Sequence, residues 1–368
     1  MGWLGTVGAV CLAAAWLVLG GAGAASGPTS APDGPDSEDA APARQLPPGA
    51  EVTITAVGDI AMGLNGALPR GGAAGLFGEV RDELAGDVVL GNLEQALTDA
   101  GSSKCGSFAA SSTCFAFRAP PAYAAGLREA GFTVLNLANN HSYDYGRAGI
   151  DETVAALRDA ELAHTGLPGK IARLQSGPVR VAVVGFAPYD VVQNMLDIPA
   201  ARALVRRADR WADIVVVTMH GGTEGVGADR VPRGPETYLG EQRGDPRAFA
   251  HAVVDAGADL VAGHGPHVLR GMEWYRERLI AYSLGNFAGH KTFNVSGRGA
   301  VSGILTVTLR GDGTLAKGRL APIRLVEDGA PVPDAAEAAH RVVRELSRAD
   351  FGRRAVDVSP VGELLPPR

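Results

Sequence analysis

Side chains of the types that bind metal ions follow five hydrophobic runs in this sequence, each at the point where the run ends. In chain order these side chains are Asp59, Glu94, Asn140, His220, and His264 with His267. Carboxylate, amide and imidazole groups together favour zinc, manganese or iron, because calcium prefers oxygen ligands alone. Two such cations about 3.5–4 Å apart lower the pKa of a bound water to about 7 and hold phosphoryl oxygens. The pattern therefore indicates a metal site suited to phosphoryl chemistry.

Any one of these residues has an ordinary explanation. A lone Asp at a strand end is usually a turn or helix-cap residue, and a lone buried His is more often a core residue than a ligand. Their joint occurrence at five run ends is what favours a metal site. Four further histidines lack such a context and are assigned to the core or the surface: His164, His251, His290 and His340.

The hydrophobic runs alternate with helical patterns, which predicts an α/β domain with strands buried on both faces. The predicted strands are 52–57, 87–91, 133–137, 179–186, 214–219, 259–261 and 279–284. The predicted helices are 122–130, 147–160, 200–208, 246–256 and 334–346. Later runs follow one another after short turns, at 272–275, 279–283, 302–309 and 320–325, so the sheet should be mixed. Ligands of open α/β sheets bind outside the carboxyl ends of the strands, where the metal-binding side chains fall.

The composition fits a folded domain that does not bind nucleic acid. Of the 368 residues, 46% are hydrophobic and 20% are charged, which allows a sizeable core. The net charge is −6. Nonspecific binding to nucleic acid or to anionic membranes needs a basic surface, so both roles are disfavoured.

The N-terminal residues 1–25 form an apolar segment that closes on small residues, as an export signal does. The segment contains no Lys or Arg, so it is read either as a cleaved signal peptide or as a retained membrane anchor. Residues 26–49 are rich in proline and polar residues, which predicts a disordered linker. The main domain is expected over 50–330, followed by a C-terminal helix and tail over 331–368.

Two cysteines, Cys105 and Cys114, lie beyond the export segment. In an exported chain an even count suggests one disulfide that closes a short loop, whereas in a reducing compartment both would be free thiols. The export segment favours the disulfide. We therefore expect the protein to be secreted or to lie on the extracellular face of the membrane.

A series of short motifs resembles the CapA family of poly-γ-glutamate capsule-synthesis proteins. The motifs are Thr55–Asp59, Asn92–Glu94, Phe117–Pro120, Asn139–Gly146, His220–Glu224, Gly263–Val268 and Tyr282–Phe287. The Asn-Asn-His-x-x-Asp-Tyr-Gly and Ser-Leu-Gly-Asn-Phe stretches are the most specific, and the resemblance runs from about residue 52 to residue 325. It implies a calcineurin-like metallophosphoesterase fold, in which mixed β-sheets form a sandwich core flanked by helices.

The resemblance implies that six residues hold two divalent cations, which would be Mn, Zn or Fe. Asp59 would bind the first cation and Glu94 would bridge the two. The remaining ligands would be Asn140 and His220 on the second cation, with His264 and His267 completing the two shells.

The resemblance also implies catalytic roles for three residues. His141 would donate a proton to the leaving oxygen, and Asp144 would orient His141 or another neighbour. Glu224 would orient His220 or act as an acid–base. Asn286 would order the rim of the site.

One departure from the family pattern affects the first cation. Related phosphoesterases have a histidine two residues after the first aspartate, but the residue two after Asp59 is Ala61. The first cation therefore lacks one expected imidazole, and whether one or two cations bind is left open.

Two further departures are glycines. Gly265 stands where many family members have the first histidine of a His-Pro-His motif, so the sharing of ligation between His264 and His267 is left open. Gly221 replaces the aromatic residue that commonly follows the histidine of the fourth motif. We expect this change to open the site.

Two functions are compatible with these residues. The first is metal-dependent phosphoester hydrolysis in the bacterial cell envelope, on a capsule or other envelope polymer or on a phosphorylated small molecule. The second is a noncatalytic component that binds or exports an anionic polymer such as poly-γ-glutamate and keeps a relict metal site. The ligand set motivates the first function, and Ala61 motivates the second. Any membrane association would be through the N-terminal segment.

Overall fold

The computed structural model describes residues 45–64, 66–106 and 114–365, all of which belong to one compact unit, Ala40–Arg368. The predicted export segment and most of the predicted linker lie outside the described residues. Within the described ranges, no helix is both long enough and apolar enough to cross a membrane.

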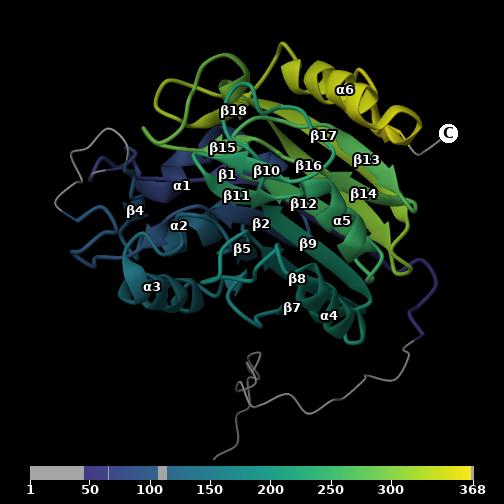
Figure 1. Ribbon diagram of the computed structural model, residues 1–368, viewed down its shortest axis with the longest axis horizontal. Coiled ribbons are helices and arrows are strands. Elements are labelled where there is room, and N and C mark those ends of the chain that lie inside the picture. Colours follow the sequence, from purple (N-terminus) through teal and green to yellow (C-terminus); the bar gives the residue numbers. More distant parts are fainter. Residues whose placement is uncertain (1–44, 65, 107–113, 366–368) are drawn as a thin grey trace, which may run out of the picture. The chain divides into compact units, whose positions relative to one another are not determined.

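Two large mixed sheets form the centre of the described fold (Figure 1). The first contains, in spatial order, β18 (Pro331–Pro333), β17 (Leu315–Leu325), β16 (Val301–Arg310), β1 (Glu51–Ile60), β2 (Val88–Leu93), β5 (Val134–Asn136) and β6 (Ala163–Thr165), and β15 (Asn286–Ala288) pairs with β1. The second contains β13 (Met272–Tyr275), β14 (Arg278–Ala281), β12 (Leu260–His264), β9 (Ile214–His220), β8 (Val179–Phe186) and β7 (Ala172–Ser176). Strands β1, β2, β5 and β6 are parallel, as are β8, β9, β12 and β14. The prediction of mixed sheets is confirmed.

The two sheets face each other across a hydrophobic core. Ile54 and Leu90 of the first sheet belong to the same buried cluster as Val181 and Val216 of the second. All four side chains are fully buried. Burial of each such side chain stabilises the fold by about 1.5–3 kcal/mol. The sandwich core that the resemblance implied is therefore present.

Helices cover the outer faces of both sheets (Figure 1). Helices α1 (Gly72–Leu76), α2 (Tyr123–Ala130) and α3 (Gly146–Asp159) pack on the first sheet, and α4 (Ile198–Asp209) and α5 (Pro246–Val254) pack on the second. Asp197 and Asp245 cap α4 and α5, each accepting a hydrogen bond from the backbone N–H three residues later. Helix α6 (Ala338–Phe351) contacts β13 and β17.

The predicted helices and strands are present with somewhat different first and last residues. The largest difference is in the C-terminal helix, predicted over 334–346 and found over Ala338–Phe351. The Asp334 side chain accepts hydrogen bonds from the backbone N–H groups of Ala336 and Ala338, which closes a turn before the helix begins. Short strands escaped prediction because they contain too few residues to show a period. They are β6, β7, β15 and β18 of the two large sheets, and β3 (Ala96–Leu97), β4 (Arg118–Ala119), β10 (Glu236–Tyr238), β11 (Glu241–Gly244), β19 (Asp357–Val358) and β20 (Leu364–Leu365).

The two cysteines form one disulfide, between Cys105 and Cys114, as expected. Their Cα atoms are 5.8 Å apart. The bridge joins the segment that follows β3 to the segment that leads into β4.

Asp259, which directly precedes β12, should make stability depend on pH. Burial raises its pKa from 3.8 to about 6, although its side chain accepts a hydrogen bond from the Val215 N–H and pairs with Arg278. The folded state therefore holds this proton more tightly than the unfolded state. Stability falls as the pH rises from about 4 to about 6, by about 3 kcal/mol at most.

We predict that Asp259→Asn removes this dependence. The free energy of unfolding of the variant, minus that of the wild type, should increase by about 2–3 kcal/mol between pH 4 and pH 7. Urea unfolding followed by circular dichroism, with a chelator present, measures this difference. Asp82→Asn, at an exposed aspartate, is the control. A difference for Asp259→Asn that does not change with pH would contradict the prediction.

Candidate metal centre

The predicted ligands lie where the carboxyl ends of the parallel strands meet. Asp59 is near the end of β1, Glu94 directly follows β2, and His220 and His264 end β9 and β12. His220 and His264 are paired neighbours in the register of their strands. The loops after β5 and β12 supply the other predicted residues, which are Asn140, His141 and His267.

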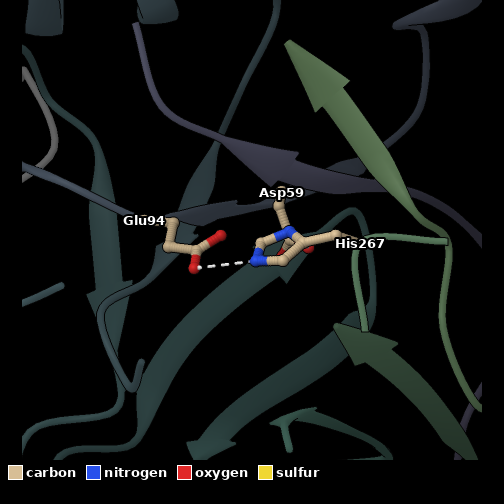
Figure 2. A group of neighbouring side chains, drawn as sticks. All are labelled: Asp59, Glu94 and His267. Atoms are coloured by element: carbon tan, nitrogen blue, oxygen red, sulfur yellow. Dashed lines mark ion pairs between the residues drawn. The ribbon is translucent and has the colours of Figure 1, made fainter. Parts of the chain in front are cut away.

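Asp59, Glu94 and His267 form the tightest group (Figure 2). One ligand atom from each lies within 4.8 Å of the others. His267 Nδ1 is 3.2 Å from Asp59 Oδ2, and His267 Nε2 is 3.6 Å from Glu94 Oε1. The imidazole ring therefore contacts both carboxylates, which come from the adjacent strands β1 and β2.

His220 and His264 approach this group from the second sheet. His264 Nδ1 is 3.7 Å from Asp59 Oδ1, and His220 Nδ1 is 3.9 Å from the same oxygen. His220 Nε2 is 3.9 Å from Glu94 Oε1. Both imidazoles are fully buried, as are both carboxylates. Both sheets thus contribute ligands to one buried centre.

Several buried atoms of this centre have no hydrogen-bond partner among the described residues. They are both carboxylate oxygens of Glu94, both ring nitrogens of His264, and Oδ1 of Asn140. A buried carboxylate or imidazole without partners is costly, and a bound cation would remove that cost. The set of two carboxylates, an amide and three imidazoles suits zinc, manganese or iron. The residues present therefore fit a cation-binding site.

The protonation pattern follows from burial and from the neighbouring charges. Burial raises the pKa of Glu94 well above its usual range and lowers the pKa of His264 to about 4. Burial opposes a charge on His267, but Glu94 and Asp59 raise its pKa to about 10. Burial also opposes the charge of Asp59, but the hydrogen bond to His267 holds the pKa of that carboxyl well below its usual range. Cation binding would therefore displace protons from this centre.

A row of polar side chains in register across the first sheet holds Asp59. Asn286 of β15, Asp59 of β1, Asn92 of β2 and Asn136 of β5 are paired residues of adjacent strands. Asn92 Nδ2 donates to Asp59 Oδ1 at 2.8 Å, and Asn92 Oδ1 accepts from Asn136 Nδ2 at 2.9 Å. No role was predicted for Asn92 or Asn136 from the sequence. An amide inside a buried strand was the available signal, because it needs polar partners.

Asn286 fixes the ring of His267. Asn286 Oδ1 is 2.9 Å from His267 Nδ1, and Asn286 Nδ2 donates to the backbone oxygen of His267 at 3.2 Å. A hydrogen bond from Nδ1–H leaves Nε2, which faces Glu94, available to a cation. This contact gives Asn286 a specific task at the rim of the site.

Arg243 is a buried cation at this centre that the sequence analysis missed. Its Nη2 is 2.7 Å from Glu224 Oε1 and 3.4 Å from His220 Nε2, and its Nη1 donates to the hydroxyl of Tyr189 at 2.5 Å. Glu224 Oε2 is also 3.8 Å from His267 Nε2. Glu224 therefore lies between Arg243 and the predicted ligands. Arg243 belongs to β11, a short strand in the loop after β9, and no local motif marked it.

His141 and Asp144 form a hydrogen-bonded pair. His141 Nδ1 is 2.7 Å from Asp144 Oδ2, and the imidazole stacks on the Phe117 ring with a centroid separation of 4.1 Å. Asp144 is fully buried and also accepts from the Phe117 N–H at 2.6 Å. The neighbouring Asn140 lies 3.5 Å from Glu224, measured from Nδ2 to Oε1. Asn140 and Glu224 thus connect this pair to the metal centre.

Two of the three departures are explained by backbone contacts. The buried Ala61 supplies no ligating atom; its N–H donates to Ala288 O and its carbonyl accepts from Thr292. Gly265 has a φ of 107°, a left-handed conformation that suits glycine. Its N–H donates to Asp59 Oδ2 at 3.3 Å, so this position supports a ligand through its backbone instead of supplying an imidazole.

The expectation that Gly221 opens the site is wrong. A Cβ atom at this position would lie 2.7 Å from Met195 Sδ and 2.9 Å from Arg243 O. These neighbours already fill the space that a larger side chain would occupy. Glycine here allows the loop after β9 to pack closely.

Comparison with known proteins agrees with the resemblance. The family model described as "Bacterial capsule synthesis protein PGA_cap" matches residues 53–291. The capsule biosynthesis protein CapA of Bacillus anthracis is 30% identical over 322 residues, which are 81% of this chain and 73% of that protein. The PGA biosynthesis protein CapA of Bacillus subtilis (strain 168) is 30% identical over 240 residues, which are 60% of this chain and 59% of that protein.

Two solved structures of nucleotidases are similar to this chain at low identity. The NAD nucleotidase of Haemophilus influenzae has a TM-score of 0.39 and 13% identity, covering 82% of this chain and 56% of that chain. The 5'-nucleotidase precursor of Thermus thermophilus has a TM-score of 0.43 and 16% identity, covering 82% of this chain and 59% of that chain. This chain spans little more than half of each.

The fold and the ligand cluster define an α/β sandwich protein with a candidate metal centre at the carboxyl ends of its parallel strands. Within that class, the chain belongs to the bacterial capsule synthesis protein PGA_cap family, in agreement with the resemblance of its motifs to CapA.

We predict that Glu94→Gln lowers the metal content by about one equivalent per chain or more, because glutamine lacks the negative charge that would balance a cation held there. Elemental analysis of the purified protein, after dialysis against trace zinc or manganese, measures the content. Glu345→Gln, at an exposed glutamate of α6, is the matched control and should keep the wild-type content. Equal metal content in Glu94→Gln and wild type would rule out Glu94 as a ligand.

Proposed function

We propose that this protein is a metal-dependent phosphoester hydrolase of the bacterial cell envelope that acts in the synthesis of capsule, poly-γ-glutamate or a related polymer. The cluster of buried ligand atoms without hydrogen-bond partners, at Glu94, His264 and Asn140, is the observation that carries the proposal. The names of the two Bacillus relatives, a capsule biosynthesis protein and a PGA biosynthesis protein, support the biological setting. The substrate would be an envelope polymer or a phosphorylated small molecule.

The predicted ligands would hold divalent cations of Mn, Zn or Fe. Cations bound there would polarise a phosphoryl group and lower the pKa of an attacking water. The protein's own contribution is to fix the ligands before substrate arrives. Asn92 holds Asp59, and Asn286 holds His267, through the hydrogen bonds described above.

His141 would donate the proton that the leaving oxygen needs. Asp144 accepts from Nδ1–H, which leaves Nε2 to carry a proton toward the substrate. The stacked Phe117 ring restricts rotation of the imidazole. Arg243 neutralises Glu224 and keeps that carboxylate beside the centre, where it can accept or return a proton.

We also propose that the protein works outside the cytoplasm. The apolar N-terminal segment supports this location. The Cys105–Cys114 disulfide supports it independently, because disulfides persist in oxidising compartments.

We predict that His141→Gln lowers kcat by about 10²–10⁴-fold without lowering metal content, since a general acid contributes rate by that factor. The assay is hydrolysis of aryl phosphate monoesters and diesters by the zinc- or manganese-loaded protein. His290→Gln, at a histidine that contacts only a loop carbonyl in the contacts described, is the control. A metal-loaded wild type that hydrolyses none of these esters would count against hydrolysis.

The alternative is a noncatalytic polymer-binding or export component, and Ala61 favours it because the expected imidazole is missing. The two functions differ in what the double variant Asn140→Ala, His141→Ala would do. Binding of poly-γ-glutamate that survives this change, with capsule still formed in cells, would support the alternative. Loss of capsule with His141→Gln alone would support chemistry.

A further inference from the structure

Two separate segments hold the two carboxylate oxygens of Asp144. Oδ2 accepts from His141 Nδ1 at 2.7 Å and from the Phe117 N–H at 2.6 Å. Oδ1 lies 2.7 Å from Lys104 Nζ, as an ion pair. The carboxylate is completely buried, whereas the Lys104 side chain is 40% exposed. Lys104 is thus the cation that balances this buried charge among the contacts described.

Lys104 also contacts the backbone of the same loop. Its N–H donates to the carbonyl of Asp144 at 2.6 Å, and its Nζ donates to the carbonyl of Asn140 at 3.3 Å. With the ion pair, these contacts join Lys104 to both ends of the 140–144 segment, which contains His141. The proposed reaction gives Lys104 no chemical step.

The disulfide connects the two segments that hold Asp144. Lys104 directly precedes Cys105, and Phe117 follows Cys114 by three residues. The cross-link keeps the Cα atoms of the two cysteines 5.8 Å apart. Without it, Lys104 and Phe117 would be less restrained relative to each other, and placing both residues against Asp144 would lose more entropy.

We propose that Lys104 is a positioning residue for the Asp144–His141 pair, and that the Cys105–Cys114 disulfide holds Lys104 and Phe117 in place against that pair. The inference rests on the proposed function of His141 as proton donor. It has a regulatory consequence. Proton donation by His141 would become efficient only after the disulfide forms. In a reducing cytoplasm the enzyme would therefore hydrolyse slowly those substrates whose leaving oxygen needs a proton.

The physical reason is that a buried carboxylate holds an imidazole firmly only when its own position is fixed. Removing the Lys104 charge leaves Asp144 with partners on one oxygen alone, which favours rotation of the carboxylate and a displaced ring. A displacement of about 1 Å can lower a rate by up to about 10²-fold. The effect should fall on proton donation and leave cation binding unchanged.

The leaving group tests this distinction. Phenolate, the leaving group of phenyl phosphate, needs a proton on its oxygen as the P–O bond breaks, whereas the weakly basic 2,4-dinitrophenolate leaves its ester without one. Lys104→Met should lower kcat for phenyl phosphate by about tenfold or more and for the dinitrophenyl ester by less than about twofold. Lys104→Arg should restore most of the lost rate. Metal content should stay at the wild-type value.

The double variant Cys105→Ser, Cys114→Ser should reproduce this selective loss. Lys317→Met, at an exposed lysine of β17, is the matched control and should change neither rate. Equal losses for both esters would indicate a general structural defect and would overturn the proposal. So would wild-type rates in Lys104→Met.

A nuclear magnetic resonance measurement tests positioning independently of activity. In the zinc-loaded protein the His141 Nδ1–H, bonded to Asp144, should give a downfield proton resonance, assigned by its loss in His141→Gln. The resonance should broaden or move upfield in Lys104→Met and in the double cysteine variant. An unchanged resonance overturns the positioning role whether or not the protein hydrolyses esters. A changed resonance in a protein that hydrolyses no ester would refute the proposed function alone.

Discussion

Burial of the Asp59 carboxylate is the constraint on which the rest of the centre depends. An isolated buried charge is too costly to keep, so the fold must surround it with donors and cations. The Asn92 amide donates to Oδ1 and the Gly265 backbone N–H donates to Oδ2. The His267 ring pairs with Oδ2 as well. These partners come from β2 and from the loop after β12. The hydrogen bonds and ion pair of the Asp59 carboxylate therefore hold the strand ends of the two sheets together.

Close packing of the backbone makes this arrangement possible. Glycine directly precedes Asp59 and His264, and in both cases a Cβ atom would collide with a neighbouring segment. The Cβ would lie 2.0 Å from the carbonyl oxygen of Gly285 at Gly58, and 2.2 Å from that of Tyr282 at Gly263. The absence of a side chain lets these segments reach the strand ends. The same approach places Asn286, which follows Gly285, beside Asp59 in the sheet register.

The candidate centre could be located from the sequence because its residues follow hydrophobic runs, and the strand ends of parallel sheets converge. Asp59 and His264 could be placed from that rule alone. Arg243 could not, because β10 and β11 contain three and four residues and show no period. Gly221 was misjudged because the space around it is set by Met195, which tertiary packing brings from another loop. Local pattern thus predicts the ligands, whereas contacts between loops decide what surrounds them.

The loop between β9 and α5 shows how those surroundings are fixed. Arg270, fully buried, forms a two-pronged ion pair with Glu236 at 2.8 and 2.7 Å and also donates to Thr223 O at 3.3 Å. A buried ion pair adds little net stability, but removing one partner is costly because it leaves the other charge buried and unpaired. The hydrogen bond to Thr223 O restrains the residue next to Glu224, which pairs with Arg243 beside the centre. Because Asp59, His220 and His264 lie in strands β1, β9 and β12, changes in this loop should leave the positions of these three side chains intact.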